Sequence, residues 1–199
     1  MHATAIQPAF RDAALESQAV FRIVMDAMAR PGSILRLEPG FVPPPPLGAT
    51  AAAIVLTLAD FETPIWLDAT LSRERSVTEF LRFHTGARIV GDPGAAIFAL
   101  ISDCRVAPPL SAFAQGTPAY PDLGATVIYQ VDTLRSHGWT FAGPGIDGEV
   151  SFGASPLPSD FAARLAGNRE RFPLGVDMIF AGRSEIAALP RSVRLVEAR

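Results

Sequence analysis

Apolar residues along the 199-residue chain alternate between helical spacing and short runs typical of strands, and this alternation restricts the possible folds. Helical spacing occurs at residues 11–30, 49–59, 73–83 and 160–171. Strand-like runs occur at residues 33–37, 64–67, 89–90, 96–101, 125–131, 139–142, 176–180, 185–189 and 193–196. Interleaved elements without a fixed repeat are typical of an α/β domain in which helices cover a sheet. Proline and glycine are spread evenly, so we predict one domain over residues 1–199, with residues 1–10 as an N-terminal extension.

Local signals refine these expected elements. Asp12 or Ser17 can cap the first helix. One face of that helix gathers four apolar residues, which are Val20, Phe21, Val24 and Met28. Residues 49–59 are apolar nearly all round, which predicts a buried helix, and residues 125–131 give the strongest strand signal. Residues 107–121 are rich in proline, glycine and serine and should form loops.

The charged residues exclude several classes of function. The chain has 20 acidic residues against 17 arginines, and a net charge of −3 disfavours nucleic acid as the main partner. No lysine occurs anywhere in the sequence. A pyridoxal phosphate enzyme needs a lysine for its Schiff base, and a Walker A loop needs one for its phosphates. Neither chemistry is open to this chain alone.

The sequence predicts a cytoplasmic protein that does not enter a membrane. No apolar run reaches the roughly 20 residues that span a bilayer, and the first ten residues do not resemble a signal peptide. The single cysteine, Cys104, cannot form an internal disulfide and lies between apolar residues, so we expect a buried, unreactive thiol. His2, His84 and His137 are scattered and have no cysteine pair beside them, so we expect no metal site. The sequence also contains no nucleophile motif, so we expect no catalytic residue.

Two short segments remain as candidate sites. In residues 81–86, Arg82 and His84 stand at the predicted end of a helix. Arg82 can simply complement the negative C-terminal end of that helix, or it can bind phosphate or phosphonate oxygens as part of an anion site. In residues 60–64, Asp60 and Thr63 lie in a loop between a helix and a strand. This loop is either a plain turn or part of a ligand site at one end of the sheet.

Several segments, in order along the chain from about residue 10 to 195, resemble the PhnH family. They are FR at 21–22, AMARPG at 27–32, TLAD at 57–60, TPIWL at 63–67, LRFHT at 81–85, GT at 116–117, GAT at 124–126, GPGI at 143–146, FPLGVD at 172–177 and LPR at 189–191. Each segment alone is a weak signal, but their common order along nearly the whole chain is specific.

The resemblance implies a three-layer α/β/α fold with a mixed sheet, similar to pyridoxal-phosphate-dependent transferases but without the cofactor. It also implies a homodimer that joins the other core subunits of the carbon–phosphorus lyase complex. That complex, a phosphonate ribosyl-triphosphate synthase, converts ATP and methylphosphonate to ribose 1-methylphosphonate 5-triphosphate and releases adenine. A radical enzyme of the complex later cleaves the carbon–phosphorus bond, and one cysteine here could not hold its iron–sulfur cluster.

We therefore expect an accessory subunit that is not catalytic alone, has no cofactor, and exposes an apolar patch for its partners. The alternative is a nucleotide- or phosphonate-binding or catalytic subunit with its own anion pocket. Candidate ligand-binding or interface residues are Asp60, Thr63, Arg82, His84 and Asp177. Asp177 is a carboxylate inside an apolar segment and would be costly if unpaired, so it either joins such a pocket or pairs with a buried arginine such as Arg191.

Overall fold

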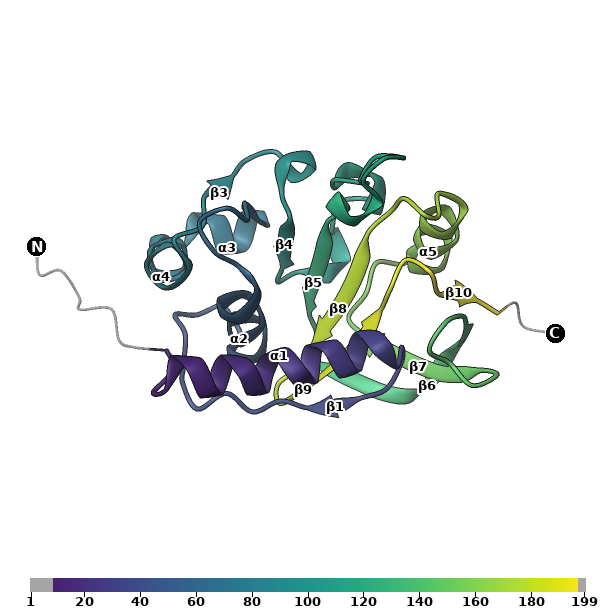
Figure 1. The fold of residues 1–199 in the computed structure, drawn as a ribbon, viewed down its shortest axis with the longest axis horizontal. Coiled ribbons are helices and arrows are strands. Elements are labelled where there is room, and N and C mark those ends of the chain that lie inside the picture. Colours follow the sequence, from purple (N-terminus) through teal and green to yellow (C-terminus); the bar gives the residue numbers. More distant parts are fainter. Residues whose placement is uncertain (1–8, 197–199) are drawn as a thin grey trace, which may run out of the picture.

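The computed structural model describes residues 9–196 and arranges them as two β-sheets with helices on either side (Figure 1). The predicted N-terminal extension, residues 1–10, lies outside the described residues except for its last two. Of these, Ala9 is buried, and the ring of Phe10 packs edge to face on Phe41 with 5.3 Å between the ring centroids. Residue 10 therefore already contacts the core.

A seven-stranded mixed sheet forms the centre of the protein, with strand order β1-β9-β8-β5-β4-β2-β3. Its parallel strands are β2 (Ile65–Leu67), β3 (Ile89–Val90), β4 (Phe98–Ile101), β5 (Thr126–Gln130) and β8 (Asp177–Ala181). Two antiparallel strands complete one side, β9 (Glu185–Leu189) beside β8 and β1 (Leu35–Arg36) beside β9. The strand predicted most strongly is thus the middle strand, β5, whose three central residues are buried, as is typical of a strand covered on both faces.

Each face of this sheet has its own apolar core, because successive side chains of a strand point to opposite faces. On one face, Ile128 and Ile179 pack with the helices α1 (Ala13–Ala29), α2 (Ala49–Leu58), α3 (Ala69–Arg73) and α4 (Arg75–Thr85). On the other face, Tyr129 and Phe180 pack with α5 (Phe161–Glu170) and with a second sheet. The chain therefore has the predicted α/β fold with three layers.

The second outer layer differs from the expected helical one, because it also contains a three-stranded antiparallel sheet. This sheet has the order β10-β6-β7, with β6 (Thr133–Ala142), β7 (Val150–Ser155) and β10 (Arg194–Leu195). The sequence predicted only the last four residues of β6 and did not predict β7. Four consecutive residues of β6, Arg135 to Gly138, are exposed, so the alternation of apolar and polar residues that marks a strand is interrupted there.

The helices differ from the predictions in detail. The helix expected at residues 73–83 is α4, which runs two residues later, whereas the short helix α3 before it was not predicted. The two helices meet at Glu74, whose N–H donates to the Leu71 carbonyl oxygen. In α1, Asp12 is the N-cap and accepts a hydrogen bond from the Leu15 N–H. The buried face of α1 is narrower than predicted, because the helix contacts α2 and β9 through a single stripe. Phe21 therefore lies on the exposed side of α1.

Candidate functional site

The predicted site residues all lie at the amino ends of the parallel strands. Residues 60–63 precede β2, the end of α4 precedes β3, and Asp177 is the first residue of β8. In open α/β sheets ligands usually bind at the carboxyl ends of the strands. The 60–64 loop therefore lies at the amino edge of the sheet, opposite the edge where ligands usually bind.

The loop of Asp60 and Thr63 is a turn closed by its own side chains. The Asp60 N–H donates to the Thr63 hydroxyl at 2.6 Å, and that hydroxyl donates back to the Asp60 carbonyl oxygen at 2.9 Å. The Asp60 carboxylate accepts the Glu62 N–H at 2.9 Å. These bonds account for an aspartate and a threonine at this spacing, because both residue types stabilise turns.

Arg82 and His84 lie in the last turn of α4, which ends at Gly86 in the left-handed conformation. Arg82 is exposed, and its carbonyl oxygen accepts the Gly86 N–H at 2.9 Å. His84 is half-buried, and its ring contacts Phe80 with 4.5 Å between ring centroids. A cation in this position complements the partial negative charge at the end of the helix.

The structure brings residues 60–63 and the end of α4 together but keeps Asp177 apart. A Cβ built on Gly86 would lie 3.5 Å from the Cβ of Phe61, so the turn and the helix end are in contact. Asp177 is in register with Thr126 of β5, which is in register with Phe98 of β4, which is in register with Ile65 of β2. Three strand spacings of about 4.8 Å separate β8 from β2, or about 14 Å.

Asp177 is paired with Arg191, which is one of the two alternatives that its apolar surroundings left open. The Arg191 guanidinium donates to both carboxylate oxygens of Asp177, to Oδ2 at 2.5 Å and to Oδ1 at 3.1 Å, and the Arg191 backbone N–H donates to Oδ1 at 2.8 Å. Their side chains are 18% and 12% exposed. Arg191 also donates to the Pro121 carbonyl oxygen at 2.6 Å. This ion pair therefore connects the loop before β5 to β8 and to the segment after β9.

A second buried carboxylate, which the sequence analysis did not single out, lies at the opposite, carboxyl edge of the sheet. Asp68 follows β2, is 8% exposed and caps α3 by accepting the Leu71 N–H at 2.8 Å. Its other oxygen accepts the Ser102 N–H, the Ser102 hydroxyl and the Asp103 N–H at 2.6, 2.8 and 3.1 Å. All its hydrogen-bonding capacity is thus used to join β2, α3 and the end of β4.

Cys104 lies beside this carboxylate and is fully buried, as predicted. Its thiol donates to the Gln130 carbonyl oxygen at 3.0 Å. Burial, with Asp103 and Asp68 nearby, raises the pKa of Cys104 to about 12. A thiol with so high a pKa is a poor nucleophile at neutral pH.

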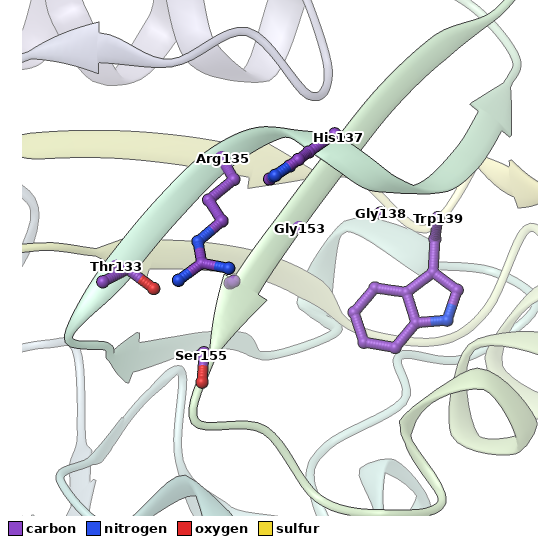
Figure 2. Close-up of a pocket in the computed structure, with 8 residues that line it drawn as sticks. Thr133, Arg135, His137, Gly138, Trp139, Gly153 and Ser155 are labelled. Carbon is purple, nitrogen blue, oxygen red and sulfur yellow. The ribbon is translucent and has the colours of Figure 1, made fainter.

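A hollow lined by polar side chains lies on the β6–β7 hairpin, away from all the predicted residues (Figure 2). It has a volume of about 450 Å³, which is in the range of small-molecule sites. Its lining residues are Thr133, Arg135, His137, Gly138, Trp139, Gly153, Ala154 and Ser155. We call it the hairpin pocket.

A bulge in β6 creates the hairpin pocket. Arg135 pairs with Gly153, and the next pair in register is Trp139 with Phe152, so residues 136–138 are extra on the β6 side. Gly138 adopts a φ of 132°, and a Cβ on Gly153 would lie 2.6 Å from the His137 carbonyl oxygen. Bulges redirect side chains and are frequent beside functional sites. The signal available in the sequence was a pair of glycines within strand-forming segments.

Within residues 9–196 there is no group of three or more histidine, cysteine or acidic side chains that could hold a metal ion. No helix in the described part of the chain combines the length and apolar character needed to cross a membrane.

Comparison with known proteins assigns the family. Residues 8–196 match the family described as "Bacterial phosphonate metabolism protein (PhnH)". The chain belongs to the PhnH family. It is also 38% identical, over 188 residues, to the "Alpha-D-ribose 1-methylphosphonate 5-triphosphate synthase subunit PhnH" of Rhizobium meliloti (strain 1021). That alignment covers 94% of each of the two PhnH chains, so the resemblance noted in the sequence segments is confirmed over nearly the full length.

Proposed function

We propose that this PhnH chain is an accessory subunit of a phosphonate-degrading synthase, in which other subunits carry out the reaction. The observation that carries this proposal is the 38% identity, over 94% of both chains, to a relative named as a subunit of ribose 1-methylphosphonate 5-triphosphate synthase. By analogy, the chain supports the formation of that product from ATP and methylphosphonate in the carbon–phosphorus lyase pathway. A cytoplasmic location and a fold related to pyridoxal-phosphate transferases belong to the same proposal.

The chemistry of the described residues supports an accessory role. The chain has no lysine for a Schiff base or a phosphate loop. Asp177 is held by Arg191, and Asp68 caps α3 and binds the end of β4. Cys104 is buried with a raised pKa. These groups stabilise the fold and are already occupied by other protein atoms.

Two exposed aromatic side chains beside the predicted site support docking to another subunit of the synthase. Phe61 and Phe83 are 70% and 65% exposed. Phe61 contacts Gly86 at the end of α4, and Phe83 stands one turn earlier on that helix. Exposed aromatic side chains are enriched where protein interfaces form. We propose that Asp60, Thr63, Arg82 and His84 form the polar rim of this contact.

A homodimer is part of the proposal as well, and α1 offers a separate surface for it. Phe21 and Met25 are exposed on the outward side of α1, one turn apart. A two-fold axis through such a helix would place the same apolar residues of both copies against each other. Sedimentation of the wild-type chain as a dimer, and of the Phe21→Ser/Met25→Ser variant as a monomer, would support this surface. A monomeric wild-type chain at micromolar concentration would contradict the dimer.

Co-purification tests the accessory role. The tagged chain is co-expressed with the other subunits of the synthase, and we expect a stable complex to elute. The Phe61→Ser/Phe83→Ser variant should elute without the other subunits. Val106→Ser is the matched control, because Val106 is 77% exposed and follows β4 at the opposite edge of the sheet. A wild-type chain that never co-elutes would contradict the accessory role, and a double variant that co-elutes normally would remove the proposed contact.

The alternative, an anion pocket at Arg82 and His84, stays a prediction. It requires Arg82→Ala to weaken nucleotide or phosphonate binding measured by calorimetric titration. Unchanged titrations would leave these residues with the contact role alone.

A further inference from the structure

We propose that the hairpin pocket is a binding site for a small organic phosphate or phosphonate, with Arg135 and His137 binding the oxyanion and Trp139 contacting the rest of the ligand. The site is separate from the predicted residues, because it lies on the second sheet and not at the amino edge of the central sheet. The proposal concerns the isolated chain and does not require the assembled complex.

The first reason is that the pocket gathers two basic side chains without partners. The side chains of Arg135 and His137 are exposed and form no hydrogen bond or ion pair with another group in residues 9–196. An arginine can bind two oxygens of a phosphate or phosphonate through parallel N–H groups. An imidazole N–H beside it adds a further donor. Asp132, the acidic residue next to this end of β6 in the chain, is not among the lining residues.

The second reason is the arrangement of hydrogen-bonding groups on one face of the hairpin. Thr133 pairs with Ser155 and Arg135 pairs with Gly153, so these four residues share a face. The Thr133 hydroxyl is buried and has no hydrogen-bond partner among the described residues. A buried hydroxyl without a partner is costly, so Thr133 holds an unused hydrogen-bonding group beside the pocket. Figure 2 shows the Arg135 guanidinium on the same side of the hairpin as Thr133 and Ser155.

The third reason is the space beside these groups. Gly153 has no side chain to fill the position opposite Arg135, and the bulge at residues 136–138 widens the hairpin. The indole of Trp139 forms one wall and is held by Phe161 of α5, with 5.3 Å between ring centroids. A volume of about 450 Å³ exceeds that of a single inorganic phosphate and leaves room for a sugar or an aromatic base. The choice of phosphorus oxyanions over carboxylates rests on the proposed function.

The two tryptophans of the chain give a direct measurement, because each contributes one indole N–H signal to a nuclear magnetic resonance spectrum. Trp139 lines the pocket, whereas Trp66 packs against Phe113 in the core and serves as an internal reference. The signals are assigned with Trp66→Phe. Methylphosphonate, tripolyphosphate and ATP are then titrated separately into the full chain. We expect saturable movement of the Trp139 signal and a stationary Trp66 signal.

The three probes distinguish the sources of the oxyanion. Binding of methylphosphonate alone would assign the pocket to a phosphonate group. Equal binding of tripolyphosphate and ATP would assign it to a triphosphate, and tighter binding of ATP would place the base on Trp139. Each of these outcomes supports the proposal.

Variants test the assigned residues. Arg135→Gln should weaken binding about tenfold or more, because it removes a charged two-point contact. Arg73→Gln is the matched control, since Arg73 is also exposed but lies on α3, and it should change the affinity less than about twofold. No movement of the Trp139 signal at millimolar probe would overturn the proposal, as would equal weakening by both variants. Arg135→Gln should still co-purify with the synthase subunits, so failure of the pocket and failure of the accessory role give different results.

Discussion

Replacing Asp68 should destabilise the protein more than replacing any exposed aspartate, because four hydrogen bonds end on this one buried carboxylate. In Asp68→Ala, loss of the N-cap of α3 costs about 1 kcal/mol. The N–H groups of Ser102 and Asp103 lose their acceptor in a half-buried position, which costs about 1 kcal/mol each. The expected loss in free energy of unfolding is therefore about 3 kcal/mol.

Asp68→Asn keeps the shape of the side chain but removes its negative charge. Its amide keeps one oxygen acceptor but turns an NH2 group toward N–H donors on one side, so we expect a loss of about 2 kcal/mol. Asp92→Ala is the matched control, because exposed Asp92 accepts a single N–H, that of Gly94, at 2.9 Å. It should cost less than about 1 kcal/mol.

Urea unfolding followed by circular dichroism measures these differences, provided that the slope m is the same in all variants. The reasoning would be refuted if Asp68→Ala lay within about 1 kcal/mol of the wild type, or if Asp92→Ala were equally destabilised. Should Asp68→Ala fail to fold, Asp68→Asn still allows the comparison.

Three further predictions follow from the buried contacts, each checked by the same unfolding measurement unless stated. Asp177→Ala should cost about 3–5 kcal/mol, because it leaves the guanidinium of Arg191 buried without its carboxylate, and a loss below about 1 kcal/mol would contradict the role of the pair. Gly124→Ala should destabilise the protein by more than about 2 kcal/mol, since its Cβ would lie 2.3 Å from a backbone carbonyl oxygen. Gly167 lies within α5 and has nothing within 4 Å of a new Cβ, so Gly167→Ala should instead stabilise the protein by about 0.5–1 kcal/mol. A Gly167→Ala variant less stable than Gly124→Ala would be inconsistent with the packing around the two glycines. Because the raised pKa of Cys104 favours the protonated thiol in the folded state, stability should fall as the pH rises from about 9 to about 12, and iodoacetamide should react at pH 8 only after urea is added.

The inner strands β4, β5, β8 and β9 of the central sheet were predictable because they are buried on both faces and are therefore mostly apolar. The pairing of Asp177 was predictable for a related reason, since a carboxylate in an apolar segment needs a partner. The short helix α3 was not predicted, because it has only five residues and its N-cap, Asp68, is held by the end of β4, which is distant in sequence.

The hairpin pocket could not be predicted, since it depends on which residues of β6 and β7 face each other. Arg135 and Gly153 are far apart in sequence, and only the pairing of the strands, together with the extra residues 136–138, makes them neighbours. The position of the 60–64 loop could not be predicted either, because it depends on the direction of the parallel strands. The crossover connections set that direction and place the loop at the amino edge of the sheet, whereas ligands usually bind at the carboxyl edge.

The lengths of the outer strands restrict how the protein can associate with others. Both edges of the central sheet end in strands of two residues, β1 (Leu35–Arg36) and β3 (Ile89–Val90). A partner that extended the sheet would gain only a short ladder of backbone hydrogen bonds at either edge, and short edge strands protect natural sheets against such pairing. Partners of the central sheet must therefore recognise side chains on the helices and loops, so the specificity of association depends on those side chains and not on pairing of backbone strands.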